Sequence, residues 1–426
     1  MRVLIVAEHA SAQFGGEALL PVQYFRQLRA RNMEAWLVVH ARTRSELETL
    51  FPEDGDRLHF IPDTWLHKLL DRCRRLLPRR VGEVTVGLIN HLYTQMIQRR
   101  LVCGLVQEHQ IDIVHEPIPV SPKYPSLMFD VGAPVVIGPL NGGMDFPPAF
   151  RASQNPIEEL TVTVSRHFSN LFNRLVPGKL RAQTVLVANE RTKQALPAGV
   201  RGTVIKVAEN GVDFSVWQSA TSRPKQPNQK IHFVFVGRLV DWKAVDFLLE
   251  AFQPVAAAMD ANLEIIGDGV MRQELEAQTV RLGLSNNVVF TGWLSQKQCA
   301  VKLQQADVLV LPSLLECGGA ALLEAMAMGL PVIATNWGGP TDYVDSSCGI
   351  LIEPTSREAL VNELTDAMLK LAQSPDLRRK MGGAGQDRVR KYFDWERKVD
   401  RIVEIYHQTK ANTTIKPIVE TPLIAR

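Results

Sequence analysis

Two glutamates, Glu316 and Glu324, flank a run of small residues in the segment PSLLECGGAALLEAMAMGLPV. A buried strand, ADVLVLPS, comes directly before them and is expected to end near Ser313. We expect a helix to begin around Gly318 and Gly319, where glycine lets an anion approach free backbone N–H groups.

In this arrangement Glu316 would lie at the mouth of the helix. Glu324 would lie roughly 7–8 Å further along the helix axis. This spacing suits a sugar nucleotide, with one carboxylate on the sugar and the other on the ribose hydroxyls. The alternative is a helix whose first turn favours acids only because of its dipole.

A second polar cluster follows the buried strand KIHFVFV, where a turn at Gly237 is followed by Arg238 and Lys243. Two cations between a strand end and a helix can offset the charge of a diphosphate without a metal ion. A solvated pair of cations is the alternative for this cluster taken alone.

Together these residues resemble the retaining glycosyltransferases of family 4, which have the GT-B fold. In that family a GR(L)…K pattern followed by an E-x7-E block marks the donor half. The resemblance covers nearly the whole chain and includes the motifs GEALLP, VHEP, ENGVD, IGDG, FTGW and FDWERKVDRIVEIY.

The resemblance implies that Arg238 and Lys243 hold the pyrophosphate, that Glu316 orients the donor sugar and that Glu324 holds the ribose. The family usually has Gly-Phe-Gly after the first glutamate, whereas this chain has Cys317-Gly318-Gly319. We therefore expect a sugar pocket of a different shape, with these three residues also contacting the donor.

Strands alternate with helices twice along the 426 residues, which predicts an α/β protein of two facing doubly wound Rossmann-like domains with an interdomain cleft. We expect an acceptor-side domain at 1–215, a nucleotide-sugar-binding domain at 230–393, and a crossover helix with a tail at 394–426. A polar, proline-containing linker is expected at 222–230. The expected strands are 2–8, 35–40, 58–62, 111–115, 134–138, 184–188, 231–237, 262–266, 287–291, 306–311, 331–334 and 349–352, and a helix is expected from Glu17 to Ala30.

Three features of the first half point toward the cleft. Gly15-Gly16 follows the first strand, and its backbone is expected to reach the donor diphosphate, with a plain tight turn as the alternative. His115 ends the fourth strand within a motif that in the family faces the donor sugar and the reacting centre, so we expect a catalytic role. Asn141-Gly142-Gly143 follows the fifth strand and is assigned to the acceptor side, although a structural turn is nearly as well supported.

The composition limits the partners, metal sites and cellular compartment that are expected for the protein. The apolar fraction of 46% is ample for two cores, and the net charge of +3 gives no argument for a nucleic-acid partner. Five cysteines without a C-x-x-C pattern argue against disulfides or zinc. The N-terminal run meets Glu8 too early for a signal peptide, so a cytoplasmic protein without a membrane span is expected.

The segment 67–100 carries eight Lys or Arg residues against two acids, interleaved with leucines. Such a surface can lie on anionic lipid headgroups, so we predict peripheral contact with the inner face of a membrane, with a solvated face as the alternative. Many family members glycosylate lipid-linked acceptors, which agrees with this prediction.

The predicted reaction is transfer of a glycosyl group from a nucleoside-diphosphate sugar to a hydroxyl of a sugar or lipid-linked sugar, as in polysaccharide or glycoconjugate synthesis. Retention at the anomeric carbon is implied by the resemblance. No Asp-x-Asp motif accompanies the donor residues, so we expect no metal ion and no other cofactor. Two alternatives are a nucleotide-sugar epimerase and an inactive nucleotide-sugar-binding protein.

Overall fold

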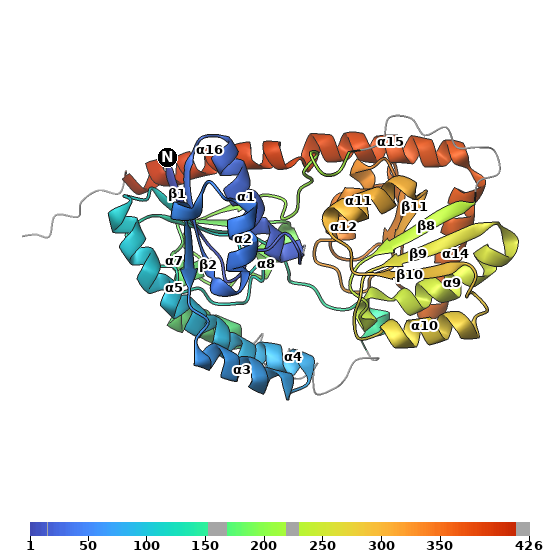
Figure 1. Cartoon of the computed structure of the whole chain (residues 1–426), viewed down its shortest axis with the longest axis horizontal. Coiled ribbons are helices and arrows are strands. Elements are labelled where there is room, and N and C mark those ends of the chain that lie inside the picture. The colour runs from blue at the N-terminus through green and yellow to red at the C-terminus, as the bar shows by residue number, and fades with distance from the viewer. Residues whose placement is uncertain (15, 152–167, 219–229, 415–426) are drawn as a thin grey trace, which may run out of the picture.

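The computed structural model describes residues 1–14, 16–151, 168–218 and 230–414. Within them the strands form two separate parallel sheets, one in each half of the chain (Figure 1). Parallel neighbours need crossover connections, and helices provide most of them.

The N-terminal sheet has the strand order β3-β2-β1-β4-β5-β6-β7. The order reverses between β1 and β4, and ligands of such sheets bind beyond the carboxyl ends of the strands at this reversal. The strands are β1 (Arg2–Val6), β2 (Glu34–His40), β3 (Leu58–Ile61), β4 (Ile113–Glu116), β5 (Val135–Leu140), β6 (Thr184–Val187) and β7 (Thr203–Lys206).

Side chains of β1 alternate between the two faces of this sheet, as the pleat requires. Val3 and Ile5 join a core with α1, while Leu4 and Val6 join a second core with α5. The helices of this half are α1 (Leu19–Ala30), α2 (Arg44–Leu50), α3 (Trp65–Arg75), α4 (Arg79–Gly82), α5 (Leu88–Glu108), α7 (Gly178–Arg181) and α8 (Glu190–Gln194). A further helical stretch covers 168–175.

The C-terminal sheet has the order β10-β9-β8-β11-β12-β13, with its reversal between β8 and β11. One continuous apolar core surrounds it. Its strands are β8 (Ile231–Val236), β9 (Ala261–Ile266), β10 (Val288–Gly292), β11 (Val308–Leu311), β12 (Val332–Thr335) and β13 (Gly349–Ile352). Its helices are α9 (Val245–Ala258), α10 (Arg272–Arg281), α11 (Gln296–Gln305), α12 (Ala320–Ala327), α13 (Pro340–Tyr343), α14 (Arg357–Gln373) and α15 (Pro375–Tyr392).

The last helix, α16 (Trp395–Thr414), returns to the N-terminal half, so that α15 and α16 run along both halves (Figure 1). Trp395, Val399, Ile402 and Tyr406 fill the same core as α1. The N-terminal sheet is therefore closed on one face by a helix from the far end of the described chain.

The strand β7 was not predicted. It lies at the edge of the sheet, and its four residues are partly or fully exposed, so they lack the apolar run that marks a buried strand. The predicted helix from Glu17 begins as a 3₁₀ turn at Gly16–Ala18 before α1 starts at Leu19. Most of the predicted linker and the final twelve residues lie outside the described residues.

No helix of the described residues combines the length and the apolar character needed to cross a bilayer.

Candidate active site

A cleft of about 550 Å³ lies between the two halves of the chain. Its walls come mainly from the C-terminal half, and Gly16, Glu17 and Val120 line it from the N-terminal half. The volume falls in the range of roughly 300–1,000 Å³ that small-molecule sites occupy.

The donor residues predicted from the sequence come from the two strands beside the reversal of the C-terminal sheet. Arg238 and Lys243 follow β8, and Glu316 follows β11. Since both strands end at the same edge, residues far apart in the sequence face one space.

Close backbone contact fixes the turn that carries Arg238. Gly267 has a φ of +138°, and a Cβ at this position would lie 1.9 Å from the carbonyl oxygen of Gly237. Leu239 N–H donates to the carbonyl oxygen of Asp268 at 2.9 Å. The turns after β8 and β9 therefore brace each other, and the exposed Arg238 side chain lines the cleft.

Lys243 and Glu316 form an ion pair in the cleft wall. Each side chain is 13% exposed, so the pair is largely screened from water and both groups are held in place. A diphosphate that reached Lys243 would share its ammonium group with Glu316.

The loop after Glu316 presents backbone amides to the cleft. Gly319 adopts a left-handed conformation with φ +86° at the N-cap of α12. Residues 318–321 line the cleft, and their N–H groups donate to no other described residue. Such a helix start attracts anions.

Glu324 lies in the second turn of α12 and also lines the cleft. Burial raises the pKa of its carboxyl to about 7. Within the described residues the Glu324 carboxyl has no side-chain partner, so it is available to a ligand.

The predicted residues Cys317 and Gly16 line the cleft as well. Burial raises the pKa of the Cys317 thiol to about 12, so it is not a thiolate near neutral pH. Glu17 accepts a hydrogen bond from Val120 N–H at 2.9 Å, which ties the loop after β1 to the loop after β4. Gly15 lies outside the described residues.

Glu209 is a cleft residue for which no role was predicted, although it lies in the motif ENGVD. It follows β7, lines the cleft and accepts a hydrogen bond from the Asn141 side chain. Burial raises the pKa of its carboxyl to about 7. A Cβ added to Gly318 would lie 2.4 Å from Asn210 Nδ2 and 3.0 Å from Glu209 Oε2, so 209–210 packs directly on the loop 316–319, called the donor loop after its predicted role.

The prediction that Asn141 serves the acceptor side needs correction. Its buried amide donates to Glu209 and, at 2.8 Å, to the carbonyl oxygen of Cys317, so it joins the two halves of the chain. The buried environment of these groups leaves this amide little freedom to bind a substrate.

Gly142 and Gly143 are also engaged within the protein. Gly142 N–H donates to Thr192 Oγ1 at 3.0 Å, and a Cβ on Gly143 would lie 2.7 Å from the Cβ of Ala195. Neither glycine is among the residues that line the cleft. These contacts support the alternative prediction, a structural turn.

His115 does not face the cleft, contrary to the prediction. It is fully buried, with Nε2 2.6 Å from the carbonyl oxygen of Gly138 and Nδ1 2.6 Å from the hydroxyl of Tyr406. Burial lowers the pKa of the imidazole to about 4. The strand end turns this side chain toward α16, where it serves packing and hydrogen bonding.

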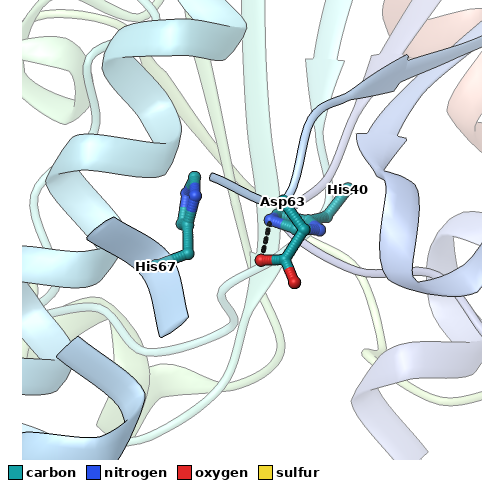
Figure 2. Close-up of side chains that lie close together, drawn as sticks. All are labelled: His40, Asp63 and His67. Atoms are coloured by element: carbon teal, nitrogen blue, oxygen red, sulfur yellow. Dashed lines mark ion pairs between the residues drawn. The ribbon is translucent and has the colours of Figure 1, made fainter. Parts of the chain in front are cut away.

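Three possible metal ligands, His40, Asp63 and His67, lie close together beyond β2 and β3 (Figure 2). Their ligand atoms lie within 4.8 Å of one another. Both ring nitrogens of His67 are already engaged, since Thr64 N–H donates to Nδ1 at 3.2 Å and Nε2 lies 3.2 Å from Thr94 Oγ1.

The interactions of His40 and Asp63 also argue against a metal ion at this site. A metal-bound histidine usually donates through its second ring nitrogen, whereas Nδ1 of His40 accepts from Arg42 N–H at 3.3 Å. The Arg42 guanidinium pairs with Asp63 at 2.8 Å. We therefore assign this cluster to joining β2, the loop after β3 and α3.

The chain does contain one Asp-x-Asp sequence, Asp54-Gly55-Asp56. It precedes β3 and is not among the residues that line the cleft. Asp54 pairs with Arg29 at 2.8 Å. This sequence therefore has a structural role in the N-terminal half.

Comparison with known proteins locates one family within the chain. Residues 218–388 match the family model described as Glycosyl transferases group 1. A GDP-mannose-dependent monoacylated alpha-(1-6)-phosphatidylinositol monomannoside mannosyltransferase from Corynebacterium glutamicum is 31% identical over 212 residues, covering 46% of this chain and 54% of that protein. The chain spans about half the length of the curated relatives it matches.

Solved structures cover nearly the whole chain. A glycosyltransferase from Rickettsia africae has a TM-score of 0.66 at 16% identity and covers 97% of this chain and 99% of its own. HepE from Anabaena, in complex with UDP and glucose, has a TM-score of 0.62 at 18% identity and covers 96% of this chain and 100% of its own. The predicted GT-B fold, with two Rossmann-like domains, is confirmed.

Gly318→Ala tests the packing of the donor loop on 209–210. The new methyl group would overlap Asn210, so we expect the free energy of unfolding to fall by about 1–3 kcal/mol in chemical denaturation. Gly383→Ala is the control, because a Cβ there meets nothing within 4 Å and the residue lies inside α15. Equal stability of the two variants would contradict the packing.

The buried imidazole of His115 predicts a pH dependence of stability. Its pKa is about 4 in the folded protein and about 6.5 when unfolded, so the neutral form favours folding. The stabilisation is complete above about pH 6.5 and is lost as the pH falls toward 4. In His115→Gln the loss of unfolding free energy across this range should shrink by about 1–3 kcal/mol. The exposed His407→Gln is the control, and an unchanged profile in His115→Gln would disprove the assignment.

Proposed function

We propose that the chain is a group 1 glycosyltransferase, the family whose model matches residues 218–388, and that it transfers a glycosyl group from a nucleoside-diphosphate sugar to an acceptor hydroxyl with retention. The observation that carries the proposal is the convergence of two cations, a helix N-terminus and two carboxylates on one cleft. HepE, which has the same fold, was solved with UDP and glucose, so this fold can hold such a donor.

The donor diphosphate is assigned to Arg238, Lys243 and the amides of 318–321. These groups line one wall of the cleft and come from the turn after β8 and the start of α12. They would supply positive charge from the protein itself, which supports the proposal that catalysis needs no metal ion.

The two carboxylates are assigned to different parts of the donor. Glu316 precedes α12 and pairs with Lys243, which supports a position beside the proposed diphosphate site, where the sugar would be attached. Glu324 lies further along α12, where a bidentate contact with the ribose hydroxyls is proposed.

In the proposed reaction the bond from the anomeric carbon to the phosphate oxygen breaks, and the bond to the acceptor oxygen forms on the same face of the sugar. The acceptor proton passes to an oxygen of the leaving diphosphate. Arg238 and Lys243 stabilise the charge that develops there, which is commonly the largest catalytic contribution. His115 has no part in this step, because it is buried away from the cleft.

The acceptor is proposed to be a sugar or a lipid-linked sugar, bound from the N-terminal half, with a polysaccharide or glycolipid as product. A nucleotide-sugar epimerase would convert its donor without any acceptor. An inactive binding protein would show neither transfer nor slow donor hydrolysis. Product analysis of a panel of UDP-, GDP- and ADP-sugars with and without acceptor separates these three functions.

Arg238→Ala and Lys243→Ala should each weaken binding of a nucleoside diphosphate at least about tenfold, since each removes a charge-assisted contact. Calorimetric titration measures this effect. Arg281→Ala is the control, because Arg281 is an exposed arginine of α10 that does not line the cleft. Wild-type affinity in either cleft variant would show that the diphosphate site is placed wrongly.

Substitutions of the two glutamates, Glu316 and Glu324, should affect different properties of the protein. Glu324→Ala should weaken free nucleotide and sugar nucleotide alike by about 1–3 kcal/mol, because both carry the ribose. Glu316→Ala should bind free nucleotide nearly as wild type does but lose turnover, because the sugar loses its orientation.

Titration with nucleoside diphosphate and a transfer assay on both variants check this difference. Glu274→Ala, an exposed glutamate of α10, is the control. Equal nucleotide losses in the two cleft variants, or full turnover in Glu316→Ala, would overturn the assignment.

A further inference from the structure

The helix at 168–175 has two polar side chains inside and its large apolar side chains outside. Ser169 and Asn173 are buried, and Asn173 Nδ2 donates to the carbonyl oxygen of Lys123 at 3.1 Å. The exposed side chains are Phe168 at 51%, Leu171 at 50%, Phe172 at 38% and Leu175 at 71%. Their i, i+3, i+4, i+7 spacing makes one continuous stripe. A surface helix normally has the opposite arrangement.

The helix α3 also exposes large apolar side chains on one face. Trp65 is 73% exposed, Leu69 44% and Leu76 85%. Lys68 and Arg72 are exposed between them. The spacing of 65, 69, 72 and 76 places these residues along one side of the helix.

The two helices are connected through the segment 123–126. Lys123 accepts the hydrogen bond from the helix at 168–175, and the next residue, Tyr124, donates through its hydroxyl to the carbonyl oxygen of Glu83 at 3.1 Å. Glu83 begins the π-helical turn Glu83–Gly87, which packs against α3 and α4. In Figure 1, α3 and α4 form the lower edge of the N-terminal half. We call the exposed apolar residues of both helices the apolar rim: Trp65, Leu69, Leu76, Phe168, Leu171, Phe172 and Leu175.

We propose that the apolar rim inserts into the headgroup region of an anionic lipid bilayer. The positive charges around it are complementary to anionic lipid headgroups. Between 65 and 77 there are four Lys or Arg residues and one acid, and Arg174 adds an exposed cation beside the stripe of the second helix. Basic residues beside Trp, Phe and Leu are typical of helices that lie on a bilayer surface.

The helix at 168–175 extends the contact that the sequence predicted through 67–100. Two elements give the protein a defined orientation on the membrane, which a single basic helix would not. The proposal does not depend on the proposed transfer reaction, because lipid binding requires neither donor nor acceptor.

Sedimentation with vesicles tests the proposal, using phosphatidylcholine alone and phosphatidylcholine mixed with phosphatidylglycerol. The wild-type chain should bind the anionic vesicles more tightly, because its cations are drawn to the surface. Leu171→Ser combined with Leu175→Ser should weaken that binding at least about tenfold, because two apolar side chains no longer enter the bilayer. Lys68→Gln combined with Arg72→Gln should weaken binding to anionic vesicles and leave any binding to neutral vesicles unchanged.

Val270→Ser combined with Val280→Ser is the matched control. Both valines are exposed, at 84% and 67%, and lie in the C-terminal half away from the apolar rim. This variant should bind vesicles as the wild type does. Failure of the wild type to bind anionic vesicles, or equal losses in the leucine and valine variants, would overturn the proposal.

Two further measurements test whether the apolar rim is covered by protein instead of lipid. If the wild-type chain is a dimer by light scattering and the leucine variant is a monomer, a second copy covers this face and the proposal fails. If the leucine variant loses unfolding free energy while the valine variant does not, another part of the same chain covers it and the proposal also fails. Unchanged mass and stability, together with weaker vesicle binding, support it.

Discussion

The position of the donor loop depends on one buried polar contact, in which the Asn141 amide donates to both Glu209 and the carbonyl oxygen of Cys317. These three residues come from the end of β5, the exit from β7 and the loop before α12. Lys398 of α16 donates to the carbonyl oxygen of Glu209 and adds a fourth segment. Buried polar groups are costly unless they are paired, so this network favours a single relative arrangement of the two halves.

The same contact explains why the donor loop is rich in glycine. Residues 209–210 approach Gly318 so closely that a side chain there would collide with them. At Gly319 the chain must turn into α12 with a positive φ, which glycine adopts at little cost. The family's usual Gly-Phe-Gly would place a phenyl group where Gly318 meets Asn210. The Cys-Gly-Gly sequence therefore provides the space that the close approach of 209–210 requires.

Local spacing was enough to predict much of the fold and the convergence of three polar residues on one wall of the cleft. Arg238, Lys243 and Glu316 follow buried strands whose ends meet at one edge, so strand patterns alone bring them together. His115 and Asn141 were placed wrongly because their partners lie far along the chain, at Tyr406 and Cys317. A strand end shows which edge a side chain lies on, but not which helix or loop covers it. The edge strand β7 was missed because its burial is too slight to leave an apolar pattern.

The return of α16 has a consequence for the order in which the protein matures during synthesis. Trp395, Ile402 and Tyr406 complete the core beneath α1, yet they are made after the entire C-terminal sheet. Until they emerge from the ribosome, the core between α1 and the N-terminal sheet lacks these side chains. Domains usually fold as units, the first one first. Here the core of the first sheet is completed only after the second sheet has been made, so a nascent chain exposes part of this apolar core until α16 has been synthesised.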